Sequence, residues 1–265
     1  MLPLDKLTEK AYADFASKGC DPAAFDAVLA LDMNLSGDFG RTWLALDRTR
    51  KRLYRLSESD GAFAEYLAVD IRNLILLPDD LSFACASLVE PGAVARAAVR
   101  RLEVKLGDTV VIWGAGPIGL IAAAWAKRAG ASVVRVVDIS EEKLAFAKKF
   151  GFEAYDEARD GLCDCAIEGT GAPQALCSLI QAMKPHSRVI LMGNPARDMT
   201  ITQSVYSQIL RREITLRGTW NSSYNDMIND WEATVAAMAD GSIQYEGLIT
   251  HRYPISRTLE ALEMS

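Results

Sequence analysis

The sequence is poor in the residues that build metal centres and disulfide frameworks. Its 265 residues include two histidines and five cysteines, and the cysteines show no framework spacing. An odd number of scattered cysteines argues against a disulfide-stabilised secreted domain and favours reduced thiols. The first ten residues carry Asp5, Lys6 and Glu9, where a secretory signal requires an uninterrupted apolar stretch. We therefore expect a cytoplasmic protein.

An excess of positive charge and a long hydrophobic run are also lacking. Lys and Arg total 29 against 35 Asp and Glu, so the formal net charge is −6. Nucleic-acid-binding domains are normally strongly basic, and we expect no nucleic acid partner. The longest uncharged run, residues 109–126, has three glycines and a proline in its middle, which suits a strand, a turn and a helix better than a membrane span. The expected partner is a small molecule, with no membrane involved.

What the sequence does contain is typical of a large α/β domain. Half of the residues are hydrophobic and 24% are charged, as in a globular protein. From residue 109 onward, short β-branched runs alternate with longer helical patterns, which indicates repeated βαβ units and a parallel sheet. We expect a doubly wound (Rossmann) sheet with the strand order 3-2-1-4-5-6. The six predicted strands cover residues 109–113, 133–137, 152–155, 163–167, 188–192 and 214–218.

Helix start and stop signals lie between these strands. The connection 155–163 is too short for a substantial crossover helix. The first 60 residues follow another pattern, with a helix around Leu7, Ala11 and Phe15 and a hairpin of strands 42–46 and 53–56. The predicted helices of the main domain run over 116–130, from a Ser140 cap to 151, from Pro173 onward, and over 228–241.

A glycine-rich turn joins the first of the six strands to its helix. Residues 114–119 read Gly-Ala-Gly-Pro-Ile-Gly, directly after the apolar run TVVIW. In such a turn the first glycine makes the sharp bend, the second lets the backbone approach a pyrophosphate, and the third lets helix and strand pack closely. The phosphates then lie at the positive end of the helix. We predict that Gly114, Gly116 and Gly119 bind a dinucleotide.

The second predicted strand ends in an acid, Asp138, 19 residues beyond Gly119. An acid at about this spacing accepts hydrogen bonds from the hydroxyls of the adenosine ribose. A carboxylate there would repel a 2′-phosphate, so NAD is favoured over NADP. The alternative is a structural glycine turn in which Asp138 is an ordinary helix-capping acid.

The stretch from about residue 61 to residue 265 resembles the C-terminal part of a medium-chain, zinc-type alcohol/polyol dehydrogenase. The segment GTWNSSY, with NDWE and LITHRYP after it, is similar to the galactitol-1-phosphate dehydrogenase branch of this family. The matching segments are GAFAEYLAV (61–69), LVEP (88–91), GDTVVIWGAGPIGLIAAAWAK (107–127), VVDISEEKLAFAKKFG (136–151), AIEGTGAP (166–173), VILMGNP (189–195) and GTWNSSY (218–224).

The resemblance implies which positions bind the cofactor NAD. Pro117 and Ile118 complete the pyrophosphate turn. Ile139 lies beside the adenine, and Lys143 makes a second contact to the ribose or to a charge. Thr170, within Gly-Thr-Gly, lies in the loop after the fourth strand. Gly193 and Trp220 fall in the two loops that line the nicotinamide.

The resemblance also implies a zinc ion that stabilises the substrate alkoxide, and such a zinc needs about three protein ligands. Glu90, in the LVEP segment, matches one family ligand; the alternative is a surface acid before a proline turn. The family takes a Cys and a His-Glu pair from its N-terminal half. Here both histidines, His186 and His251, follow the glycine-rich turn, and Cys20 is the only N-terminal cysteine. We expect that this chain binds no zinc, and we assign no catalytic residue.

Two cysteines and the two histidines receive structural interpretations. Cys163 and Cys165 are one residue apart on a predicted buried strand, so alternation places both thiols on the same face of the sheet. His186 follows Lys184-Pro185 and is predicted to lie in a turn, and His251 is predicted to be structural.

The predicted organisation has four parts. A divergent N-terminal segment (1–60) precedes a remnant of a GroES-like catalytic domain (61–100). A NAD-binding Rossmann domain (101–245) follows, and then the truncated start of a return to the catalytic domain (246–265). The resemblance further implies that the last strand, 214–218, pairs across a homodimer axis.

Three functions remain open. The first is a NAD-dependent oxidoreductase that takes hydride from a secondary alcohol of a polyol or sugar-alcohol phosphate. The second is a non-catalytic NAD-binding module or partner subunit, because the zinc ligands are missing. The third is a zinc-free NAD(P)H reductase of the same superfamily, which relies on binding geometry and the nicotinamide. Ancestry favours the first function, and the residue inventory favours the second.

Overall fold

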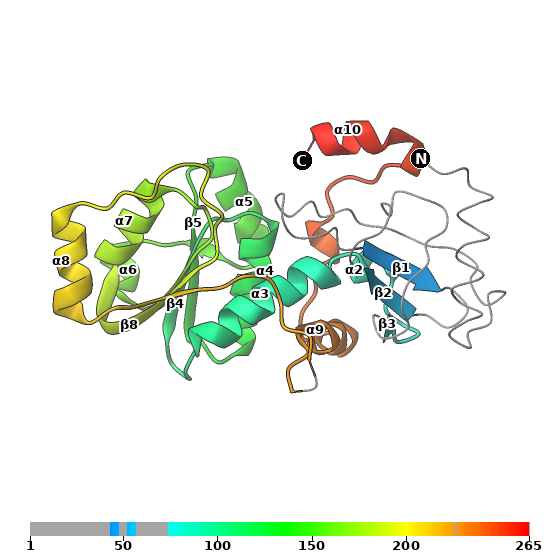
Figure 1. Ribbon diagram of the computed structural model, residues 1–265, viewed down its shortest axis with the longest axis horizontal. Coiled ribbons are helices and arrows are strands. Elements are labelled where there is room, and N and C mark those ends of the chain that lie inside the picture. The colour runs from blue at the N-terminus through cyan, green and yellow to red at the C-terminus, as the bar shows by residue number, and fades with distance from the viewer. Residues whose placement is uncertain (1–42, 48–51, 57–73, 226, 265) are drawn as a thin grey trace. The chain divides into compact units, whose positions relative to one another are not determined.

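A computed structural model describes residues 43–47, 52–56, 74–225 and 227–264 (Figure 1). The chain divides into two compact units. The larger unit is Leu88–Leu248, and the smaller combines Met1–Ser87 with Ile249–Ser265. The larger unit contains the glycine-rich turn.

Six parallel strands form the sheet of the larger unit, in the order β6-β5-β4-β7-β8-β9. This is the predicted order 3-2-1-4-5-6, so the doubly wound fold is confirmed. The strand order changes direction between β4 and β7, so the turn after β4 lies at the switch point where such folds bind nucleotides. The strands are β4 (Thr109–Trp113), β5 (Val133–Val137), β6 (Glu153–Ala154), β7 (Cys163–Glu168), β8 (Met183–Leu191) and β9 (Thr215–Gly218).

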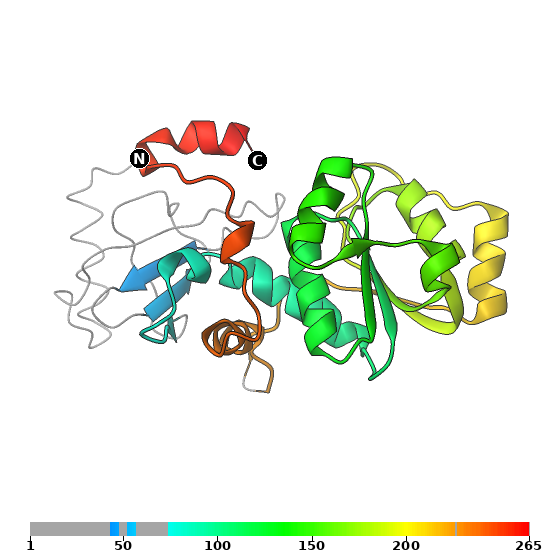
Figure 2. The same cartoon turned by 180° about the vertical axis from the view of Figure 1, so that it is seen from behind.

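Helices cover both faces of this sheet, as Figures 1 and 2 show. One face packs on α7 and α8 through a buried cluster that includes Val111, Ala166 and Val189 from three neighbouring strands. Side chains of the opposite face meet α3, where Arg188 Nε donates to the Leu102 carbonyl at 3.1 Å. The helices are α3 (Val89–Leu102), α4 (Pro117–Arg128), α5 (Glu141–Lys149), α6 (Glu157–Asp160), α7 (Pro173–Gln181), α8 (Gln203–Arg212), α9 (Asp230–Ala239) and the 3₁₀ turn η3 (Glu246–Leu248).

The structure contains a helix at each place where the sequence has a clear helix start signal. Helix α5 begins after Ser140, whose hydroxyl accepts from the Lys143 amide, and α4 and α7 begin with proline. The four-residue α6 is the only helix between β6 and β7 in the described chain, as the short connection predicts. Helices α3 and α8 were not predicted. Both end at a glutamate in the left-handed conformation, Glu103 and Glu213, where a glycine would mark the stop.

The prediction for the two cysteines of β7 is wrong. The register between β7 and β8 shifts between Cys163 and Cys165. Cys163 belongs to the buried cluster under α7, whereas Cys165 Sγ lies 2.8 Å from Arg188 Nη2 on the α3 face. Alternation holds only along an uninterrupted ladder. His186 lies in β8 at this irregularity with φ of 60°, so the predicted turn is a distortion within a strand.

The smaller unit contains a three-stranded antiparallel sheet, ordered β1-β2-β3. Its first two strands confirm the predicted hairpin, with Trp43 opposite Leu56. The predicted helix around Leu7 and the segment 61–69 lie outside the described residues. Among the described helices, none has both the length and the apolar character that a membrane crossing requires. The elements are β1 (Trp43–Asp47), β2 (Arg52–Leu56), β3 (Leu74–Leu76), α2 (Phe83–Ala86), η4 (Ile255–Arg257) and α10 (Thr258–Glu263).

Candidate functional site

The glycine-rich turn connects β4 to α4 with the geometry that its sequence predicts. Gly114 follows the strand with φ of 108°, a conformation that favours glycine. A Cβ atom at Gly119 would lie 1.9 Å from the Gly114 carbonyl oxygen. The third glycine therefore allows the first turn of α4 to pack against the end of β4, as in dinucleotide-binding turns.

The second glycine borders open space. Gly116 is the N-cap residue of α4 and offers no side-chain cap to the helix, and a Cβ atom added there would meet no atom within 4 Å. Pro117 follows as the first helical residue and is exposed, and Ile118 is half-buried. Because first-turn amides have no partner within their own helix, this end of α4 is suited to an anion such as a pyrophosphate.

Asp138 lies beside this turn, directly after the carboxyl end of β5. Its Oδ2 atom accepts from the Ala115 amide and its Oδ1 atom accepts from the Ser140 amide, both at 2.9 Å. Since a carboxylate has about four acceptor positions, these two bonds orient the group and leave acceptor capacity for a ligand. Ser140, rather than Asp138, is the N-cap residue of α5, so the helix-cap alternative is not what the structure shows. Ile139 and Lys143 are both exposed.

The loops after β7 and β8 complete the same edge of the sheet. Gly169 donates to the Trp113 carbonyl at 2.8 Å, which holds the loop against the end of β4. A Cβ atom at Gly193 would lie 2.2 Å from the Gly171 amide nitrogen, so the two loops touch through their backbones. The structure therefore brings Thr170 and Gly193 together, next to Gly114.

A buried acid that the sequence analysis did not identify shapes the first of these loops. Glu168 ends β7 and is 1% exposed. Its carboxylate accepts from the amides of Thr170 at 2.8 Å and Gly171 at 3.1 Å, and also from the Thr170 hydroxyl. The sequence signal that could have identified Glu168 is its position directly before Gly-Thr-Gly, at the end of a predicted strand.

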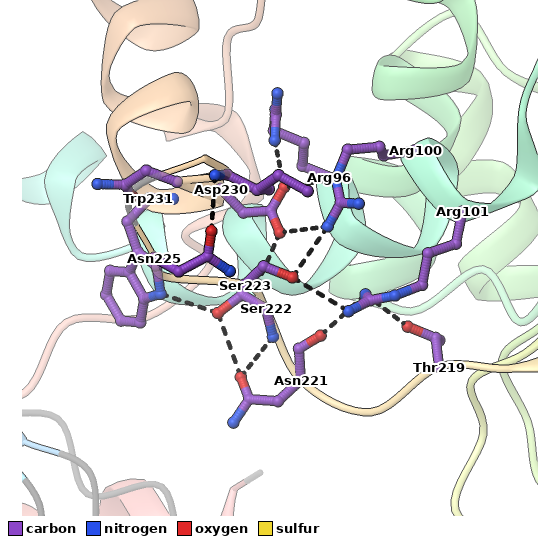
Figure 3. Close-up of polar contacts among 12 residues, drawn as sticks. Arg96, Arg100, Arg101, Thr219, Asn221, Ser222, Ser223, Asn225, Asp230 and Trp231 are labelled. Carbon is purple, nitrogen blue, oxygen red and sulfur yellow. Dashed lines mark hydrogen bonds and ion pairs between the residues drawn. The ribbon is translucent and has the colours of Figure 1, made fainter.

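The loop after β9 starts at the same edge, because the Thr219 amide donates to the Leu191 carbonyl at 3.0 Å. Trp220 follows and is 51% exposed. Behind the loop lies a charged cluster that the sequence analysis also missed, formed by Arg96, Arg100 and Arg101 of α3 with Asp230 of α9 (Figure 3). Arginines spaced four and five residues apart on one helix were the only local signal.

The described residues do not form a zinc site. Glu90 lies in the first turn of α3 and is 3% exposed, so the alternative of a surface acid is wrong. In the part of the chain that the structure describes, no group of three or more His, Cys, Asp or Glu side chains could hold a metal ion. Both histidines are exposed: His186 lies 3.2 Å from Glu213 and His251 contacts Thr250.

Comparisons with known proteins agree with this geometry. Residues 117–240 match the family model described as zinc-binding dehydrogenase. The chain is 32% identical over 210 residues to galactitol 1-phosphate 5-dehydrogenase of Escherichia coli (strain K12), covering 74% of this chain and 61% of that protein. It is 31% identical over 217 residues to L-threonine 3-dehydrogenase of Colwellia psychrerythraea, covering 77% and 61%.

Among solved structures, the galactitol-1-phosphate dehydrogenase of Escherichia coli superposes with a TM-score of 0.72 at 25% identity. The superposition covers 87% of this chain and 75% of that chain. The chain thus spans about three fifths of the length of the curated relatives that it matches.

Two glycine variants test the geometry of the turn. Gly119→Ala should lower the free energy of unfolding by about 2–4 kcal/mol, because the new methyl group collides with backbone. In an unhindered helix the same change would stabilise by about 1 kcal/mol. The matched control Gly116→Ala should change stability by less than about 1 kcal/mol, since it enters open space. Denaturant unfolding followed by circular dichroism measures both, and equal losses would contradict the assigned packing.

Proposed function

The chain belongs to the zinc-type medium-chain dehydrogenase family, and from that premise we propose that it is a NAD-dependent oxidoreductase acting on a secondary alcohol. The observation that carries the proposal is the Asp138 carboxylate, held by the Ala115 amide beside the turn that opens α4. An acid fixed at this place matches the ribose of a dinucleotide whose pyrophosphate lies on the helix.

The residues of this edge fit the cofactor. The amides that open α4 after Gly116 would hold the pyrophosphate, and Asp138 would accept from the ribose hydroxyls. When bound, NAD supplies the nicotinamide ring that accepts the hydride. In the proposal, Ile139 and Lys143 flank the adenosine. Thr170, Gly193 and Trp220 border the nicotinamide.

Asp138 also bears on the choice between NAD and NADP. Its two backbone hydrogen bonds fix the carboxylate in one orientation, so it cannot swing away from a 2′-phosphate without losing them. Two negative groups at hydrogen-bond distance repel each other. We infer that NAD is preferred.

The substrate class follows from the relatives. Their names give galactitol 1-phosphate and L-threonine as substrates of those proteins. For this chain we propose a polyol or sugar-alcohol phosphate, because the segment after β9 resembles the first of these branches. We also propose a cytoplasmic location, because an odd number of scattered cysteines favours reduced thiols.

The zinc ion of the family does not fit the residues present. The sequence has no histidine before His186, and Glu90 has no group of further metal ligands around it in the described ranges. No step of the proposed reaction is therefore assigned to zinc. This observation favours a second candidate function, a NAD-binding module or partner subunit without turnover. A zinc-free NAD(P)H reductase is the third candidate.

Calorimetric titration tests cofactor binding. The wild-type chain should bind NAD more tightly than NADP. Asp138→Asn keeps the shape but removes the charge, and should weaken NAD binding about 10- to 100-fold, since hydrogen bonds to charged groups are worth about 1.5–3 kcal/mol. NADP binding should change little. Asp240→Asn, at an exposed aspartate of the α9 C-cap, is the control. Equal losses for both nucleotides would refute the ribose assignment.

Metal content and turnover separate the three functions. We expect NADH formation from galactitol 1-phosphate or sorbitol if the first holds, and NAD binding without turnover or zinc if the second holds. Reduction of a quinone or enone by NAD(P)H in the presence of EDTA would favour the third. Elemental analysis should find well under one zinc per chain. One zinc per active chain would contradict the conclusion that the residues present do not form a zinc site.

The last strand supports the proposed homodimer. Within the described chain, β9 lies at the edge of the sheet, and Thr215, Arg217 and Gly218 are exposed there. An edge strand presents unpaired backbone groups that can pair with a second copy. Size-exclusion chromatography with light scattering at micromolar concentration should give twice the chain mass of 29.0 kDa. A proline at Leu216 should shift the mass toward the monomer, and a wild-type chain that is only monomeric would contradict the proposal.

A further inference from the structure

The segment that follows β9 makes side-chain and backbone hydrogen bonds to helices α3 and α9. Residues 219–223 carry no helix or strand in the described structure, yet the segment turns most of its polar groups toward α3 and α9. Trp220, by contrast, is about half exposed. Asn221 adopts the left-handed conformation with φ of 55°, which a non-glycine residue keeps only where its surroundings hold it. The loop is therefore held in place while about half of the Trp220 surface is open to solvent.

Arg101 of α3 makes most of the contacts to the start of this loop. One terminal nitrogen, Nη1, donates to Thr219 Oγ1 at 2.9 Å and to the Asn221 carbonyl at 3.3 Å. The other, Nη2, donates to Ser223 Oγ at 3.2 Å. These acceptors are neutral oxygens, so the guanidinium serves as a rigid fork that joins three loop positions.

Asp230 holds the far end of the loop. Its side chain is fully buried at 0% exposure and pairs with Arg96 and Arg100. Oδ2 also accepts from the Ser223 amide at 2.8 Å. Burial raises the pKa of the Asp230 carboxyl, but the hydrogen bonds from Arg100 and the Ser223 amide and the nearby arginine charges outweigh it, so the pKa is lowered. The carboxylate is therefore charged and shared between α3 and the loop.

Arg100 joins the two ends. Its Nη2 donates both to Asp230 Oδ2 and to Ser223 Oγ at 3.0 Å, so Ser223 is contacted by Arg100, Arg101 and Asp230 together (Figure 3). The neighbouring Ser222 Oγ accepts from the Trp231 indole at 2.8 Å. The loop is thus held along its length, from Thr219 to the start of α9.

We propose that Arg96, Arg100, Arg101 and Asp230, the arginine–aspartate network, position Trp220 for the nicotinamide half of the bound dinucleotide. This inference rests on the proposed function. The Thr219 amide donates to the carbonyl of Leu191, two residues before Gly193, so the loop that carries Trp220 begins at the carboxyl edge of the sheet. A loop ordered before binding loses less conformational entropy when a ligand contacts it. The four residues are positioning residues, since they act through the loop.

A purely structural role would give a different result. If the network only joins α3 to α9, its loss lowers stability and affects every ligand of the site alike. If it positions Trp220, its loss weakens ligands that contain nicotinamide and spares those that lack it. NADH and ADP-ribose form such a pair, because they share the pyrophosphate and the adenosine that bind at Gly116 and Asp138.

The experiment compares the binding of NADH and ADP-ribose by calorimetry in the full chain. Arg101→Lys keeps the charge and the Asp230 pairs, but it loses the fork to the loop. It should weaken NADH about five- to tenfold, equivalent to about 1–1.4 kcal/mol, with ADP-ribose within about twofold and the melting temperature nearly unchanged. Trp220→Leu should give the same selective loss. Asp240→Asn, an exposed acid at the other end of α9, should alter neither.

Each outcome decides a separate question. A wild-type chain that binds neither ligand overturns the proposed function and this inference with it. A wild-type chain that binds both, with Arg101→Lys changing neither or both equally, overturns the inference alone. Asp230→Asn is a second variant of the arginine–aspartate network, and if it folds it should show the same selective loss of NADH binding. Selective loss of NADH in Arg101→Lys without a matching loss in Trp220→Leu also overturns the inference, because the indole would then not be what the network positions.

Discussion

Backbone segments meet at the carboxyl edge of the sheet at distances that leave no room for side chains, and the candidate site depends on this approach. The start of α4 packs on the end of β4 across Gly119, and the loops after β7 and β8 touch across Gly193. These contacts are made by main-chain atoms. Asp138 and Glu168 then accept from backbone amides and fix the loops in place. A nucleotide diphosphate is recognised well by such a surface.

Local signals made the sheet predictable, and their absence explains the helices that were missed. Strands β4 and β5 are short β-branched runs bounded by turns, and their predicted ranges match the structure. Helix α3 has Pro91 and Gly92 in its first turns and ends at Glu103 without a glycine. A local pattern there indicates a turn, whereas packing against α4 and α9 makes the helix. The shifted register at Cys163 and Cys165 likewise arises from the pairing with β8. Side-chain alternation within one strand does not predict it.

The candidate site likewise contains residues that local sequence patterns indicate and residues that they do not. The place of Asp138 beside the turn was predictable, because it depends on a fixed spacing within one βαβ unit. Glu168 lies within three residues of its partners, so its role had a local signal that was overlooked. Arg101 and Asp230 act across separations of 118 to 134 residues, and neither has a sequence neighbour that points to its partner. Long-range charge pairs follow from the fold, and the sequence alone does not indicate them.

In the proposed function, cofactor binding and turnover depend on different groups of residues. The edge that we propose binds the dinucleotide is built within Leu88–Leu248 from backbone groups and two acids, Asp138 and Glu168. The family's zinc chemistry needs histidine and cysteine ligands, which this sequence does not provide before the glycine-rich turn apart from Cys20 and Cys85. The loop after β9 also belongs to the unit Leu88–Leu248, where Arg100, Arg101 and Asp230 hold it.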